Sequence, residues 1–455
     1  MSFDSVNPAT DERMGSFPET SLADQEAALA HAAKAAEAWR KQPLKGRAAL
    51  LRRVAEILRR DPERYARLIT AEVGKPITEA RGEIEKCAWV CDYYAEHGAR
   101  LMRDEQIAIE GARAKVAFLP LGTILAIMPW NFPFWQVFRF ATAALTAGNA
   151  AILKHAANVP QCALAIAEIF RLAEAPDGLF QCLLIPSSAV ARLITDPRIH
   201  AVSLTGSEAA GRAVAAIAGR ALKKTVLELG GSDPFIVLAD ADLERAAAAA
   251  VTSRYQNAGQ SCIAAKRFIV VEAIAEDFLT LVQARLAALK CGDPRDESVK
   301  MGPLARHDLR VALHAQVAAS IAQGAVARLG CAIPEGPGNY YPPSLLDHVR
   351  PGMPAYSEEL FGPVATVLRV RDTKEAISVA NDTRFGLGAS LWTRDLKRGE
   401  RLGRRIESGS TFVNAFVKSD PRVPFGGIKA SGYGRELARY GLREFVNIKT
   451  LWIAP

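Results

Sequence analysis

From about Lys115 onward, short apolar segments of strand length alternate with segments of helical length. The first unit predicts a strand near Ile124–Met128, a helix over Val137–Ala147 and a strand at Ala150–Leu153. The same order continues with a helix near Gln161–Leu172, a strand at Ala201–Leu204, a helix from Glu208 and a strand at Phe235–Leu238. Repeated strand–helix–strand units place their strands parallel in one sheet. The sequence therefore predicts an α/β fold built on a parallel sheet.

The remaining segments extend this organisation on both sides. Residues 23–103 carry apolar side chains at helical spacing, which predicts a helical N-terminal region. A second alternating series comprises a strand at Phe268–Val271, a helix over Glu276–Leu289, a strand near Val364–Val370 and a helix at Thr373–Asn381. The terminal segment Phe445–Ile453 looks like a strand that lacks a local partner. For 455 residues, at roughly 150 residues per domain, we expect two or three domains.

One segment is long and apolar enough to raise the question of a membrane span. Val116–Phe138 carries no formal charge over 23 residues. Three prolines, at positions 120, 129 and 133, would interrupt a spanning helix and leave backbone groups unpaired in lipid, so we predict a strand, a turn and a helix start. The first fifteen residues include Asp4, Asp11 and Glu12 and no apolar signal-peptide core, which favours a cytoplasmic protein.

Charge and cysteine content exclude further classes of protein. The net charge of +8 is spread along the chain and aromatic content is only 7%, so we expect no nucleic acid partner and, at most, attraction for anionic small molecules. Seven cysteines without paired spacings predict reduced thiols. Cys87 and Cys91 lack the CxxC or histidine pair of a zinc site, so we expect no metal and two buried helix cysteines.

One cysteine has neighbours that suit a nucleophile. Cys262 follows the small, flexible segment Asn257–Ser261 and precedes the basic residues Lys266 and Arg267. An exposed and stabilised thiolate is one interpretation of this pattern. A buried structural cysteine is the other, and it is the more frequent one on position alone.

Three further segments carry polar groups of catalytic type. Glu228 lies in an apolar stretch, which raises a carboxyl pKa and suits a base, although a turn or cap residue is the commoner case. Asn131, between two prolines and two aromatic residues, offers a fixed amide donor for an oxyanion, and an Asx turn fits equally well. The segment Leu204–Gly211 follows a strand and opens a helix, so its backbone N–H groups suit a pyrophosphate, although it matches neither a P-loop nor GxGxxG.

Taken in order along the chain, these segments closely resemble the aldehyde dehydrogenase superfamily. The motifs that carry the resemblance span nearly the whole chain: Pro129-Trp130-Asn131-Phe132-Pro133, Ile152-Leu153-Lys154, Thr205-Gly206-Ser207, Glu228-Leu229-Gly230-Gly231, Gly259-Gln260-Ser261-Cys262, Glu358-Glu359-Leu360-Phe361-Gly362-Pro363 and Pro424-Phe425-Gly426-Gly427. Within the superfamily, Lys154-His155-Ala156, Tyr255-Gln256-Asn257 and Lys418-Ser419-Asp420 look like the short bacterial succinate-semialdehyde dehydrogenase branch.

The resemblance implies a subunit in three parts. Residues 1–105 and 121–227 would form a dinucleotide-binding domain with a parallel sheet, and residues 228–430 an α/β catalytic domain. Residues 106–120 and 437–455 would form a small β oligomerisation element, which gives the terminal strand its partner. Members of the family commonly form homodimers or homotetramers, and we expect the same here.

The resemblance also implies a mechanism of aldehyde oxidation. Cys262 would attack the aldehyde, the Asn131 amide and the Cys262 N–H would hold the oxyanion, and hydride would pass to NAD or NADP. Glu228 would then activate the water that hydrolyses the thioester. The residues expected to bind the cofactor are Trp130, Lys154, Gly206, Ser207, Glu359 and Phe361. Members restricted to NAD typically carry a Glu three residues after the matching lysine, and Ala157 stands there, so we expect both cofactors to be used.

The substrate expected from the resemblance is succinate semialdehyde. Arg139 matches the residue that binds its carboxylate, and so does Ser419. Better-known members carry a second arginine where this chain has Gln256, a neutral and weaker donor. Alternatively, Arg139 is a helix-face arginine paired with a neighbouring acid, and the protein is a general aliphatic or other semialdehyde dehydrogenase. A CoA-acylating dehydrogenase would not need Glu228, and a non-catalytic binding relative would not need the set of Cys262, Asn131 and Glu228.

Overall fold

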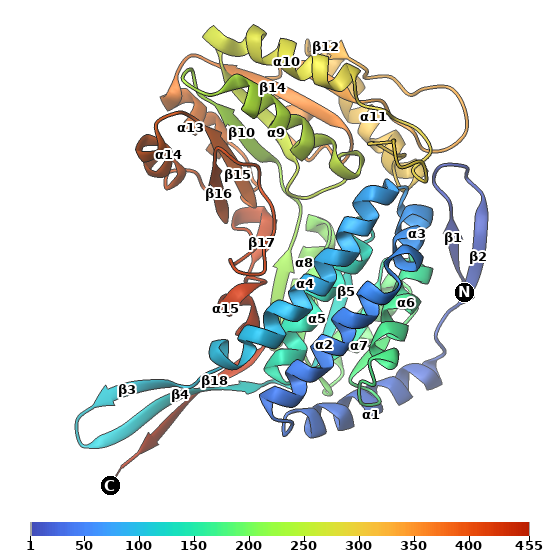
Figure 1. Ribbon diagram of the computed structural model, residues 1–455, viewed down its shortest axis with the longest axis vertical. Coiled ribbons are helices and arrows are strands. Elements are labelled where there is room, and N and C mark those ends of the chain that lie inside the picture. The colour runs from blue at the N-terminus through green and yellow to red at the C-terminus, as the bar shows by residue number, and fades with distance from the viewer. Residues whose placement is uncertain (1, 455) are drawn as a thin grey trace.

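The computed structural model describes residues 2–454 and begins with a hairpin and four helices (Figure 1). Strands β1 (Ser2–Val6) and β2 (Arg13–Pro18) pair antiparallel, a hairpin that the sequence analysis did not anticipate. The predicted helical region follows as α1 (Leu22–Trp39), α2 (Leu44–Arg60), α3 (Pro62–Val73) and α4 (Ile77–Leu101), so that prediction is confirmed. Helices α2, α3 and α4 pack against one another, and α4 also packs against α5 (Pro133–Ala147).

The first large sheet has six strands in the order β17-β9-β8-β5-β6-β7, and all but β17 run parallel. Its strands are β5 (Thr123–Met128), β6 (Ala150–His155), β7 (Phe180–Cys182), β8 (Ile199–Thr205), β9 (Lys224–Glu228) and β17 (Gly432–Tyr433). The connecting helices are α5, α6 (Pro160–Leu172), α7 (Val190–Thr195) and α8 (Glu208–Arg220). The predicted strand–helix alternation is confirmed, and parallel pairing brings the carboxyl ends of β5, β6 and β8 to one edge.

The second large sheet has seven strands in the order β12-β13-β14-β11-β10-β15-β16, with only β12 antiparallel. Its strands are β10 (Asp233–Val237), β11 (Ala265–Val271), β12 (Val326–Leu329), β13 (Ser344–Asp347), β14 (Val364–Val370), β15 (Gly388–Trp392) and β16 (Ser410–Val413). Its helices are α9 (Leu243–Tyr255), α10 (Ala275–Ala287), α11 (His307–Ala322), α12 (Pro354–Ser357), α13 (Thr373–Asn381) and α14 (Leu396–Gly403). The chain crosses between the two sheets at residues 229–232.

A three-stranded antiparallel sheet projects from the first unit (Figure 1). It consists of β3 (Glu105–Ile109), β4 (Ala112–Pro120) and β18 (Val446–Ile453), in the order β18-β4-β3. The predicted terminal strand therefore pairs with β4, in a register that joins Val446 to Pro120. The short helix α15 (Ala438–Leu442) precedes β18 and packs against α5.

The uncharged segment 116–138 is divided as predicted among the end of β4, β5 and the start of α5. Pro133 occupies the first turn of α5, where a missing N–H costs no hydrogen bond. Over residues 2–454, no helix combines the length and apolarity that a membrane crossing requires.

Candidate active site

The loop that carries Cys262 has an unusual backbone. Three consecutive residues ahead of it adopt positive φ angles: Asn257 at 52°, Ala258 at 51° and Gly259 at 72°. Left-handed conformations are costly for Ala and tolerated by Gly, so the surrounding structure must hold this turn in place. A side chain at Gly259 would collide with the carbonyl oxygen of Gly362. The strained turn therefore fixes where the chain leaves α9 and enters the cysteine segment.

Hydrogen bonds between buried amides fasten this loop to the first unit. The Asn131 Nδ2 donates to the Gln260 carbonyl at 3.0 Å, and the Asn257 Nδ2 donates to the Asn131 carbonyl at 2.7 Å. Gln260 is fully buried and accepts from the Ala305 N–H at 2.9 Å. Asn131 is thus held beside the cysteine segment, with one of its two amide N–H groups bound to Gln260 and the other without a hydrogen-bond partner among the described residues.

The thiol of Cys262 is half-buried just beyond the strained turn. Burial is the main reason that its pKa rises to about 12. Lys266 donates to the carbonyl oxygens of Ser261 and Cys262, at 2.8 and 2.9 Å, and Arg267 donates to backbone carbonyls elsewhere. The positive charge of Lys266 still lowers the pKa of the Cys262 thiol and so favours the thiolate, as does Arg139, but burial outweighs both.

Glu228 ends β9 at the crossing between the two sheets. Its side chain is 2% exposed, and neither carboxyl oxygen has a hydrogen-bond partner among the described residues. Burial, followed by the nearby Glu436 carboxyl, raises the pKa of Glu228 well above its ordinary value. The predicted effect of apolar surroundings on this acid is confirmed.

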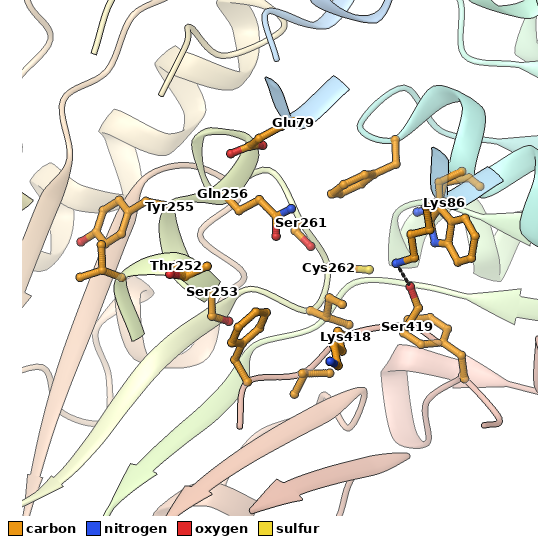
Figure 2. A pocket seen from close by; sticks show the side chains of 18 of the residues that line it. Glu79, Lys86, Thr252, Ser253, Tyr255, Gln256, Ser261, Cys262, Lys418 and Ser419 are labelled. Atoms are coloured by element: carbon orange, nitrogen blue, oxygen red, sulfur yellow. Dashed lines mark hydrogen bonds between the residues drawn. The ribbon is translucent and has the colours of Figure 1, made fainter. Parts of the chain in front are cut away.

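A cavity of about 550 Å³ opens onto Cys262 (Figure 2). Three residues predicted to bind substrate, Arg139, Gln256 and Ser419, line it together with the nucleophile segment. Four cationic side chains and one carboxyl group occur among the lining residues, namely Lys86, Arg139, Lys300, Lys418 and Glu79. The cavity is therefore suited to a ligand with negative charge.

Arg139 lies on α5 and is 1% exposed. Its guanidinium forms an ion pair with the buried Glu436, donates to the Thr205 hydroxyl at 3.3 Å and lies 4.5 Å from the centre of the Phe425 ring. The alternative interpretation, an arginine paired with an acid, is confirmed, and binding of the substrate carboxylate by Arg139, which lines the cavity, stays a prediction. The ion pair compensates much of its charge within the protein.

Lys86 on α4 is a cavity residue that the sequence analysis did not single out. Its Nζ donates to the Ser419 hydroxyl at 2.8 Å and lies 4.3 Å from the centre of the Trp135 ring (Figure 2). In the sequence, Lys86 is marked only as a lysine next to Cys87 on a predicted helix. On α4 it lies between the buried residues Ile84 and Cys87. Contact between Lys86 and Ser419 joins residues 333 positions apart, which no local motif reveals.

The residues expected to bind a dinucleotide lie around the ends of β6 and β8. The Lys154 side chain at the end of β6 is buried, burial lowers the pKa of its amine, and no carboxylate lies within ion-pair distance of that amine among residues 2–454. Ser207 caps the N-terminus of α8, just after Gly206. An uncompensated buried cation and free N–H groups at a helix start suit the hydroxyl and phosphate groups of a dinucleotide. The position of Ala157 is exposed.

The remaining predicted cofactor residues meet at the sheet crossing. Trp130 and Phe361 are in edge-to-face contact, with ring centres 5.8 Å apart. Glu359 pairs with Lys266 at 3.0 Å and accepts from the Gly231 N–H at 3.1 Å. A side chain at Gly230 would displace the Glu359 carboxylate from this position.

Neither a metal cluster nor a disulfide bond is present in the described part of the chain. No group of three or more His, Cys, Asp and Glu side chains there is arranged to hold a metal ion. All seven cysteines are free, and Cys87 and Cys91 are buried on α4 as predicted.

Comparison with known proteins agrees with this geometry. Residues 1–451 match the aldehyde dehydrogenase family. The chain is 51% identical over 454 residues, covering 100% of both chains, to a probable NADP(+) succinate-semialdehyde dehydrogenase of Synechocystis sp.. It is 50% identical over 448 residues, 98% of this chain and 97% of the relative, to the NAD(P)+ succinate semialdehyde dehydrogenase Sad of Escherichia coli.

A solved structure extends the likeness to three dimensions. The succinic semialdehyde dehydrogenase of Streptococcus pyogenes, in complex with NADP+, superimposes with a TM-score of 0.98 at 36% identity and 100% coverage of both chains. The family match and the shared fold both span essentially the whole chain. This protein belongs to the aldehyde dehydrogenase family.

Proposed function

We propose that this protein oxidises succinate semialdehyde to succinate with NAD or NADP, through a thioester on Cys262. The observation that carries the proposal is the cavity in which a half-buried thiol faces several cationic side chains and a single carboxyl group. A substrate with an aldehyde at one end and a carboxylate at the other matches both features. Two relatives with about 50% identity that are named for this substrate support the choice.

The chemical steps are assigned to three residues. The Cys262 sulfur attacks the aldehyde carbon, and the Asn131 amide with the Cys262 N–H stabilises the resulting oxyanion. NAD or NADP, when bound, supplies the hydride acceptor. Glu228 takes a proton from the water that attacks the thioester, and the acid product leaves with the thiol restored. The raised pKa of Glu228 makes its carboxylate a stronger base than that of an ordinary glutamate.

The dinucleotide is assigned to the groups at the carboxyl ends of β6 and β8. In this assignment Lys154 contacts the adenosine ribose, and Gly206 and Ser207 approach the pyrophosphate. Glu359 holds the nicotinamide ribose, Phe361 packs nearby, and Trp130 lines the same cleft. The unpaired Lys154 amine and the α8 N-terminus support this assignment. For the distal carboxylate of the substrate we assign Arg139, Gln256 and Ser419, which line the cavity with Cys262.

Cofactor choice should depend on the exposed position 157. Ala157→Glu should raise the KM for NADP roughly tenfold, corresponding to about 1.4 kcal/mol, because the new carboxylate repels the 2′-phosphate. The KM for NAD should stay within about threefold, since NAD has no phosphate there. Steady-state kinetics with each cofactor measures both values. Ala157→Gln, which adds bulk without charge, is the matched control, and an equal effect on both cofactors would contradict the assignment.

The proposed substrate predicts that the unmodified enzyme prefers succinate semialdehyde to an uncharged aldehyde of the same length. The kcat/KM for succinate semialdehyde should exceed that for butanal by at least about tenfold, because a charge-assisted contact contributes about 1.5–3 kcal/mol. Absorbance of the reduced cofactor gives both rates, and CoA should not be required. Equal or better use of butanal would leave a general aldehyde dehydrogenase, and an absolute need for CoA would indicate an acylating enzyme.

The projecting sheet is the proposed site of self-association. Exposed apolar side chains lie on its strands, namely Ile107, Ile109, Ile448, Trp452 and Ile453. Both outer strands, β3 and β18, have one edge without a neighbouring strand in the described chain, which is a template for pairing with another subunit. We therefore assign a homodimer or homotetramer. The seven free thiols support a cytoplasmic location.

A further inference from the structure

The cavity beside Cys262 contains a lysine, Lys86, that forms no ion pair within the described chain and whose charge is favoured only weakly by the more distant Glu83 and Asp420. Lys86 has no carboxylate within ion-pair distance among residues 2–454, although Lys75 on the same side of the molecule is paired with the buried Glu83. Arg139 likewise has a partner in Glu436. Burial and repulsion from Arg139 lower the pKa of Lys86 to about 8. A bound anion would offset the burial and the repulsion from Arg139, because a nearby negative charge favours the charged form of the Lys86 amine.

The contacts of Lys86 hold its amine at a defined place in the cavity. The Trp135 ring face and the Ser419 hydroxyl both bind it, at 4.3 and 2.8 Å. One ammonium N–H is directed to Ser419, and two others are available. The other two lysines of the cavity, Lys300 and Lys418, are exposed, so water screens their charges more strongly.

The direction of the Lys86–Ser419 hydrogen bond matters for a ligand. Lysine can only donate, so the Ser419 oxygen is the acceptor, and its own hydroxyl proton has no acceptor among the described residues. A carboxylate is an acceptor-only group that can take one hydrogen bond from the ammonium and one from the hydroxyl. The pair therefore presents two adjacent donors in the cavity that contains the nucleophile.

We propose that Lys86 is a specificity-determining residue that binds the distal carboxylate of the semialdehyde together with Ser419, while Arg139 is held mainly by Glu436. This inference rests on the proposed function, since it names the group that recognises its substrate. It goes beyond the assignment of Arg139, Gln256 and Ser419, because it identifies the Lys86 amine on α4 as the main positive charge that binds the substrate carboxylate. In this proposal Lys86 binds the substrate and takes no part in bond formation or proton transfer at the aldehyde carbon.

The test compares a charged and an uncharged four-carbon aldehyde. Lys86→Met should raise the KM for succinate semialdehyde roughly tenfold or more, change kcat little, and leave kcat/KM for butanal within about threefold. Lys86→Arg keeps the positive charge and should restore most of the affinity. Lys397→Met removes a charge from an exposed position on α14, outside the cavity, and should leave the KM for succinate semialdehyde unchanged within about threefold. If Lys86→Met fails to fold, Lys86→Gln replaces it, since glutamine can still donate to Ser419 without carrying charge.

Binding of the product anion gives a readout that does not depend on turnover. Succinate should raise the melting temperature of the Cys262→Ala protein, and adding Lys86→Met should abolish that shift. Equal damage to both aldehydes, or a succinate shift that survives Lys86→Met, would overturn the role of Lys86. A wild-type enzyme without preference for succinate semialdehyde over butanal would instead refute the proposed function.

Discussion

Replacing Cys262 by alanine should reduce aldehyde oxidation by about a thousandfold or more, because no other group at the site can form the covalent intermediate. The thiol is the one sulfur among the lining residues of the cavity. The sulfur must lose its proton to form a thioester, and alanine has no group that can take its place. Alanine also removes little volume from a half-buried position, so the variant should fold. Steady-state formation of the reduced cofactor measures the loss.

Cys291→Ala is the matched control for this prediction. Cys291 is exposed and does not line the cavity, so its replacement should leave activity near the wild-type value. Retention of more than a few per cent of activity by Cys262→Ala would disprove the assignment of the nucleophile. So would labelling of Cys291 or Cys162, in place of Cys262, by an alkylating aldehyde analogue.

Glu228→Gln should give a rapid burst of reduced cofactor followed by turnover slowed by about a hundredfold or more. Hydride leaves before water is needed, so loss of the base affects only the second half of the reaction. Glutamine has nearly the shape of the protonated acid, and the carboxyl oxygens of Glu228 have no hydrogen-bond partners in the described chain to lose. The site should therefore keep its geometry. Stopped-flow absorbance separates the burst from the slow phase.

A soluble thiol provides a rescue experiment for this variant. A thiolate attacks a thioester without a base to activate water, so added thiol should accelerate the slow phase of Glu228→Gln. The burst amplitude should stay close to one per active site. Loss of the burst itself would show that Glu228 acts before hydride leaves, for example by taking the proton from Cys262.

The sequence predicts much of the fold because the central strands are continuous apolar runs. Strand β5 was expected at residues 124–128 and occupies Thr123–Met128. Helix α5 begins at Pro133, four residues before its predicted start, because proline is tolerated in a first helical turn. The β1–β2 hairpin was missed, since the residues of β2 are mostly exposed and show no apolar alternation.

In the candidate site, local motifs identify some of the residues, whereas the contacts between distant residues are visible only in the structure. Motifs pointed to Asn131 and Cys262, and hydrogen bonds through Gln260 place the two segments side by side. The pairing of Arg139 with Glu436, and of Lys86 with Ser419, depends on how distant elements pack and leaves no pattern in the sequence. Sequence proximity of Lys266 to Cys262 likewise does not show that the lysine amine binds the carbonyl oxygens of Ser261 and Cys262.

The proposed mechanism requires an acyl thioester on Cys262, and mass spectrometry of the Glu228→Gln protein detects such an intermediate. The variant is mixed with succinate semialdehyde and NADP, quenched in acid during the slow phase, and then digested to locate any modification. We expect the added mass of one succinyl group per subunit, carried by the peptide that contains Cys262. An unmodified protein after a full burst, or the acyl group on another cysteine, would contradict the mechanism.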